Sequence, residues 1–114
     1  MAIAEATLQL RRTADYLRSM PLARLSRGTP SPADRGRSLA QEGAWLAAEM
    51  APESGPPTGV ELPVVGDHAV GDLLGMVANE LERVADGLPA GTSAGSQSMA
   101  AQIVEDCIQL RRDG

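Results

Sequence analysis

The sequence has no phenylalanine and no lysine, and it holds one tryptophan, one tyrosine, one histidine and one cysteine. Because Trp45 and Tyr16 are the only aromatic residues, the core must be built from leucine, valine, isoleucine, methionine and alanine. Aromatic side chains bury the most surface per residue, so a core without them gains stability in small increments. We therefore expect a marginally stable chain, or one that a partner subunit helps to stabilise.

The lone Cys107 excludes a disulfide within the chain, which fits a reducing cytosol. No apolar run approaches the roughly 18 residues of a membrane-spanning helix, and no signal peptide is visible. We expect a cytoplasmic protein without membrane contact. Every basic residue is arginine, whose codons can be GC-rich while lysine codons cannot, so we expect a bacterial source with a GC-rich genome.

The residue types that catalysis and metal binding need are too few. His68 is the sole histidine and can share a helix face only with Asp72, whereas a zinc site takes three or four protein ligands. Cys107 follows Glu105 and Asp106 on an apolar stripe, which favours a buried, unreactive thiol. Phosphate-loop, dinucleotide-binding and nucleophile-elbow motifs are also missing. We predict no catalytic, cofactor or metal-binding residue, and the balance is against an enzyme.

The sequence does contain a helical periodicity of apolar residues. Its 114 residues are long enough for one domain, which we expect to span 1–114. Apolar residues recur at steps of three and four in segments 3–20, 32–50, 67–86 and 98–112. Segments 21–31 and 51–66 are rich in proline and glycine and read as linkers. The predicted fold is all-α, a four-helix bundle or an orthogonal helical array with two irregular linkers.

Several residues mark the ends of these helices. Pro21 and Pro52 are expected to stop the first and second helices, and Ser31 and Asp67 are expected to cap the second and third. Within the linkers, Leu22 and Leu25 are spaced for one short turn, and residues 60–65 are expected to lie extended against the helices because Pro63 interrupts a strand.

Charge is distributed unevenly along this acidic chain, which has a net charge of −5 and a pI near 4.7. Seven of the ten arginines lie between Arg11 and Arg37, whereas residues 38–110 carry eleven acids against Arg83 alone. The Arg-rich segment 18–37 either binds an anion, nucleic acid or acidic partner, or pairs with the acidic half of the protein. The second interpretation is favoured, because an acidic chain repels phosphate and because segment 18–37 contains no aromatic residue that could stack on bases.

These features favour a non-catalytic helical interaction protein that self-associates as a homodimer or binds another protein. Trp45 lies about 100° round the helix from the Leu39–Leu46 stripe, at the rim of the core or in an interface. The candidate interface residues are Tyr16, Leu22, Arg24, Leu25, Arg27 and Trp45.

The alternative is a small ligand-binding or metal-free catalytic bundle, with a small-molecule pocket between helices. Its lining would be Met20, Met50, Met76 and Met99. A regulator that uses its basic arm on nucleic acid is a third, weaker interpretation, because the chain as a whole is acidic.

Overall fold

The computed structural model describes residues 2–50, 62–86 and 94–113, and these residues are almost all helical. The elements in chain order are α1 (Ala2–Arg18), α2 (Leu22–Leu25), α3 (Pro32–Met50), the 3-10 turn η1 (Asp67–Ala69), α4 (Val70–Asp86) and α5 (Ala94–Asp113). No strand occurs within the described residues, which confirms the predicted all-α fold.

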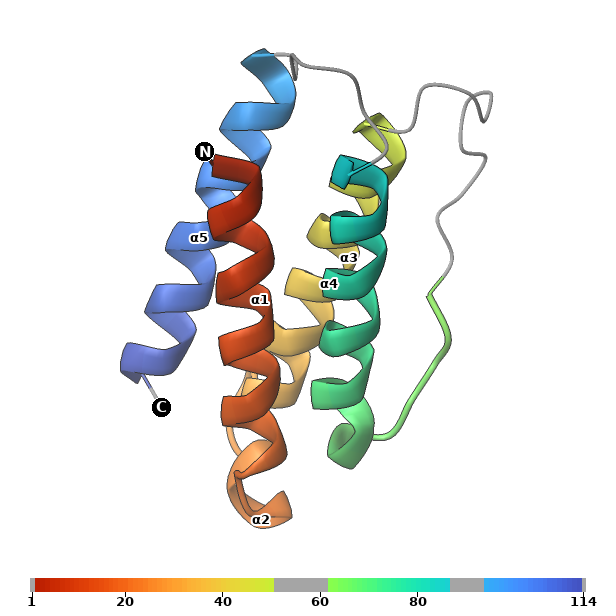
Figure 1. Cartoon of the computed structure of the whole chain (residues 1–114). Coiled ribbons are helices and arrows are strands. Elements are labelled where there is room, and N and C mark those ends of the chain that lie inside the picture. The colour runs from red at the N-terminus through yellow and green to blue at the C-terminus, as the bar shows by residue number, and fades with distance from the viewer. Residues whose placement is uncertain (1, 51–61, 87–93, 114) are drawn as a thin grey trace.

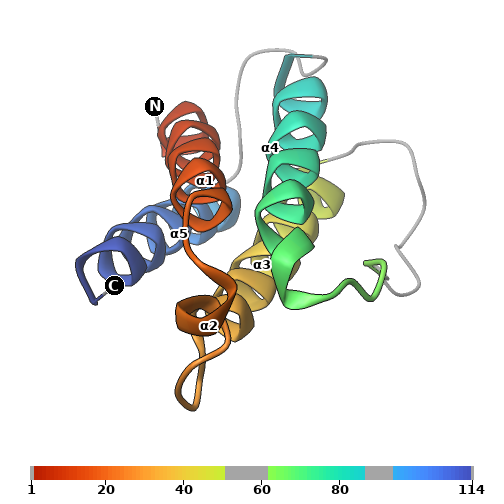
Figure 2. The same ribbon diagram turned by 90° about the horizontal axis from the view of Figure 1, so that it is seen from below.

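The long helices form a bundle in which α1 and α5 run in one direction and α3 and α4 run in the other (Figure 1). Helices α4 and α5 each pack against both α1 and α3, and α1 also contacts α3 across the middle. Seen along the bundle, the four helices are tilted relative to one another (Figure 2). Because α3 and α4 are parallel, the end of α3 and the start of α4 lie at opposite ends of the bundle (Figure 1).

The predicted helix boundaries hold at most ends. At the start of α3, the Ser31 Oγ accepts a hydrogen bond of 3.1 Å from the Asp34 amide, and the Asp34 carboxylate accepts one of 3.2 Å from the Ser31 amide. This reciprocal pair satisfies amides that the helix itself leaves free. The predicted short turn at Leu22 is α2. In the segment 60–65, which was predicted to lie against the helices, Leu62 and Val65 are partly buried against the core but Val64 is fully exposed. Residues 60 and 61 and the predicted helix stop at Pro52 lie outside the described residues.

Two boundary predictions are wrong. Helix α5 begins at Ala94, not near Ser98, because the small residues at its start continue the helix and Ser96 is buried within it. Asp67 does not cap the third helix, since the first turn there is the 3-10 turn η1. Its carboxylate instead accepts hydrogen bonds of 2.6 Å from Ser26 Oγ and from Arg37 Nη2.

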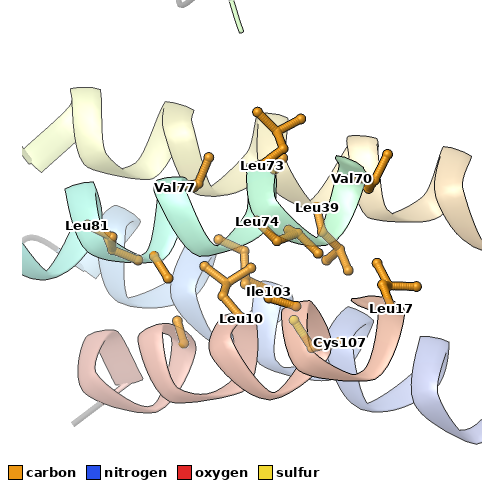
Figure 3. Packing of buried hydrophobic residues seen from close by; sticks show 14 of the residues in the cluster. Leu10, Leu17, Leu39, Val70, Leu73, Leu74, Val77, Leu81, Ile103 and Cys107 are labelled. Atoms are coloured by element: carbon orange, nitrogen blue, oxygen red, sulfur yellow. The ribbon is translucent and has the colours of Figure 1, made fainter. Parts of the chain in front are cut away.

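The buried side chains form one cluster shared by all the long helices (Figure 3). Leu10, Leu74 and Ile103 represent α1, α4 and α5 in it, and the cluster consists of aliphatic residues and Cys107. Both aromatic residues stay outside this buried set, since Trp45 is exposed and Tyr16 is only partly buried. The expectation of a core without aromatic rings is therefore confirmed.

Glycines bring the helices close enough for these small side chains to meet. A Cβ atom on Gly43 of α3 would lie 2.6 Å from the Val77 Cγ1 of α4. A Cβ atom on Gly71 of α4 would lie 2.9 Å from the Ala14 carbonyl oxygen and 2.7 Å from the Arg18 Cγ of α1. At Gly71 the obstacle includes backbone, which cannot rotate away, so this position fixes how closely α4 approaches α1.

We predict that Gly71→Ala lowers the free energy of unfolding by about 1–2 kcal/mol, although alanine is the better helix former by about 1 kcal/mol. Gly75→Ala is the matched control, because its Cβ would meet only the guanidinium of Arg18, which can swing aside. The control should be unchanged or stabilised by up to about 1 kcal/mol. Urea unfolding followed by circular dichroism measures both, and equal stability of the two variants would contradict the close backbone contact.

Candidate functional site

A groove between α3 and α5 joins the first half of the chain to the last helix. It has a volume of about 240 Å³. Arg35 and Glu42 line it from α3, Asp106 and Gln109 line it from α5, and Leu39 contributes apolar wall. Its acidic pair is the chemically unusual feature.

Glu42 and Asp106 face each other in this groove and are joined by a side-chain hydrogen bond. Burial, and then the hydrogen bond and negative charge of Asp106, raise the pKa of Glu42 to about 7. The nearest cation, Arg35, is held by Asp113 at 3.0 Å. Near neutral pH a large part of Glu42 is therefore protonated, and its neutral carboxyl can donate to Asp106.

The seam between α1 and α4 is closed by ion pairs. Arg11 Nη1 lies 3.0 Å from a Glu82 carboxylate oxygen, and Arg18 Nε lies 2.8 Å from the Asp72 carboxylate. The hydrogen bond from Arg11 holds the pKa of Glu82 below its usual value. These pairs are solvent-exposed, so each contributes only tenths of a kcal/mol and mainly sets how the two helices are aligned.

The Arg-rich segment is largely paired within the chain. Arg37 contacts the Asp67 carboxylate at 2.6 Å, and Arg35 contacts Asp113. Hydrogen bonds from Ser26 and then from Arg37 lower the pKa of Asp67. The interpretation that these arginines pair with the acidic half of the protein is supported, and for these arginines the pairing is within one chain.

A second polar cluster lies between α1 and α5. Arg111 Nη1 donates to the Thr13 Oγ1 at 2.9 Å, and its Nη2 donates to the Gln9 side-chain oxygen. The Gln9 amide in turn donates to the Glu5 carboxylate at 2.7 Å. Thr13 and Gln9 are buried, so Arg111 satisfies acceptors that would otherwise lack partners.

Cys107 lies beside this cluster and is fully buried, as predicted. Burial raises the pKa of its thiol to about 11, and a hydrogen bond with Thr13 offsets only part of that effect. A thiol with so high a pKa is almost entirely protonated near neutral pH and is a poor nucleophile.

The predicted interface residues do not form one patch. Trp45 and Leu22 are exposed, with 55% and 57% of their surface accessible. Leu25, by contrast, is only 2% exposed and packs in the core, so its placement in an interface is wrong. The short helix α2 turns Leu25 inward and leaves Leu22 outside. Tyr16 is partly buried against the core.

Arg24 and Arg27 complete that predicted set, and both are exposed. Arg27 lines a smaller groove of about 190 Å³, together with Arg35 and Asp113. Arg24, on α2, also takes part in an interaction and is not an unpartnered residue.

The predicted methionine-lined pocket is also wrong. Met20 and Met50 are buried in the core, Met99 is partly buried, and Met76 is exposed beside the α1–α4 seam. Met20 follows α1 and Met50 ends α3, so these residues fill gaps at separate places.

His68 is exposed in η1, and the Asp72 carboxylate is held by Arg18. Within residues 2–50, 62–86 and 94–113, no three histidine, cysteine or acidic residues are placed to hold a metal ion.

The Glu42–Asp106 pair was not predicted from the sequence. Asp106 adjoins Cys107 on the core stripe, and this position at the edge of a buried face was the one available signal. The partner could not be identified, because Glu42 is 64 positions away on a different helix.

No protein-family model, curated protein or solved structure matches this chain. No helix in the described part of the chain is long and apolar enough to cross a membrane.

We predict that Arg111→Met lowers the free energy of unfolding by about 1–3 kcal/mol, because it leaves the buried side-chain oxygen atoms of Gln9 and Thr13 without the hydrogen bonds that Arg111 donates. Arg112→Met is the matched control, since Arg112 is exposed and should change stability by less than about 0.5 kcal/mol. Chemical unfolding at neutral pH measures both. A loss no greater than that of the control would show that the cluster does not hold α5 to α1.

Proposed function

We propose that this protein is a non-catalytic helical interaction protein that self-associates. The observation that carries the proposal is Trp45, whose side chain lies mostly in solvent on the outer face of α3. Exposed aliphatic residues are ordinary on a protein surface. The only tryptophan of a chain that lacks aromatic core residues is different, because tryptophan is enriched among residues that dominate interface affinity.

The charge beside Trp45 favours a partner with arginine. Glu49 lies one turn after Trp45 on α3, is exposed, and among the described residues takes part in no ion pair. A second copy can supply the complement, because Leu22 is exposed in the same short segment as Arg27. In the described part of the chain, no ion pair involves Arg27 either.

The proposed contact places the Leu22–Arg27 segment of one copy on the Trp45 face of α3 in the other, twice in a closed two-fold dimer. Apolar burial of Trp45 and Leu22 supplies the affinity, and the charges set the orientation. A binding role for small molecules is less well supported. The α3–α5 groove, at about 240 Å³, is below the roughly 300–1,000 Å³ of typical ligand pockets.

We predict that the protein dimerises at micromolar concentration and that Trp45→Ala weakens dimerisation at least tenfold, or about 1.4 kcal/mol. Leu8→Ala is the control, because Leu8 is another exposed apolar residue but lies on α1. Sedimentation velocity over a concentration series measures the dissociation constants. In the wild type, the fluorescence of Trp45 should shift to longer wavelength on dilution.

A monomer at every concentration, with emission that does not change on dilution, would refute self-association. Equal effects of Trp45→Ala and Leu8→Ala would place the interface elsewhere on the molecule.

A further inference from the structure

The contact between α3 and α5 contains two carboxyl groups at the point where a bundle would ordinarily bury apolar side chains. Glu42 projects from the middle of α3 and Asp106 from the second half of α5, and both line the same groove. Leu39 and Leu110 form apolar wall beside them, and each is only 2% exposed. Any separation of α5 from α3 at this level would expose those two leucines to water.

The charged groups around Glu42 do not neutralise a second negative charge there. On α3, Arg35 is held by Asp113 of α5 at 3.0 Å, and Asp34 is held by Arg37 at 3.2 Å. Behind the pair lies Cys107, whose high pKa keeps its thiol neutral.

In the part of the chain that the structure describes, Arg35 is the one arginine that lines this groove. From α1, Arg11 and Arg18 are bound to acids of α4, and Arg83 of α4 is bound to its own neighbour Glu80. From α5, Arg111 points to α1, where it is bound to Gln9 and Thr13. Two carboxylates this close, in a half-buried site without a cation, repel each other strongly when both are ionised.

We propose that Glu42 and Asp106 form a pH-operated latch between α3 and α5, which is closed while the pair holds a proton and released when both carboxyls are ionised. In the closed form, the neutral carboxyl donates a hydrogen bond to the charged one. In the released form, that bond is lost and repulsion replaces it. The latch works within one chain and does not depend on self-association.

The direction of the pH effect follows from linkage. The pKa of Glu42 is raised in the folded chain from about 4.5 to about 7, so the folded state holds its proton more tightly than the unfolded state does. The stability that this proton confers is fully present below about pH 4.5 and is lost as the pH rises through about 7. Helix α5 stays on α1 throughout, because it is also held there by the hydrogen bonds from Arg111 to Gln9 and Thr13, which involve neither Glu42 nor Asp106.

Hydrogen exchange followed by mass spectrometry tests the latch, with rates corrected for the intrinsic pH dependence of amide exchange. Between about pH 5.5 and about pH 8.5, protection of α5 and of the facing part of α3 should fall about tenfold in the wild type, equivalent to one unit of pKa. Protection along the α1–α4 seam should not change by a comparable factor.

Glu42→Gln should abolish this pH dependence, because its amide donates to Asp106 at every pH. Glu105→Gln is the matched control, since Glu105 is an exposed acid on α5 and should leave the wild-type response intact. Asp106→Asn should weaken the pH dependence without abolishing it, because it removes the charge that faces Glu42 while the burial of Glu42 remains.

The latch is refuted if wild-type protection of α5 is independent of pH, or if Glu42→Gln and Glu105→Gln respond alike. Direct titration of the Glu42 carboxyl carbon by NMR decides the matter without any variant. A midpoint near the ordinary value for glutamate would overturn the proposal, and a midpoint near neutral pH would support it.

Discussion

The close approach of α1 and α4 at Gly71 is the constraint on which the rest of the structure depends. A core made of leucine, valine and alanine gains enough burial only if the helix backbones come near each other. The Ala14 carbonyl and the Arg18 side chain occupy the space where a side chain at Gly71 would go. Once α1 and α4 are fixed in this way, Arg11 reaches Glu82 and Arg18 reaches Asp72, so the ion pairs follow from the packing and do not cause it.

Helix α5 is held by a different kind of contact. It buries Ile103 and Cys107 in the common core, but it makes polar interactions with α1 on one side and with α3 on the other. On the α1 side, Arg111 satisfies buried acceptors, and on the α3 side Glu42 and Asp106 are joined by a side-chain hydrogen bond. Buried polar groups are costly when they lose a partner. The attachment of α5 is thus the part of the fold most sensitive to solution conditions, whereas the α1–α4 seam is fixed by shape.

Features encoded locally were predictable from the sequence. Apolar stripes placed the helices, Ser31 and Pro21 marked helix ends, and the stripe position of Cys107 indicated its burial. Contacts between distant segments were not predictable. The preference of Arg18 for Asp72 depends on the helix order and on the missing side chain at Gly71. The Glu42–Asp106 pair depends on α5 packing antiparallel to α3, which periodicity does not specify.

The same limit explains why the burial of Leu25 could not be predicted, whereas the exposed position of Trp45 could. Leu22 and Leu25 are equivalent in sequence, both apolar and both in a polar linker, and only the docking of α2 against α3 and η1 decides which one turns inward. Trp45 belongs to a long helix whose core face is already fixed by Leu39 and Leu46, so its own direction follows from the helical repeat. Its exposure leaves an apolar ring beside the exposed Glu49, on a chain whose arginines are largely paired internally. If Trp45 forms the proposed interface, the affinity comes from burial of the ring, and an incoming arginine would pair with Glu49.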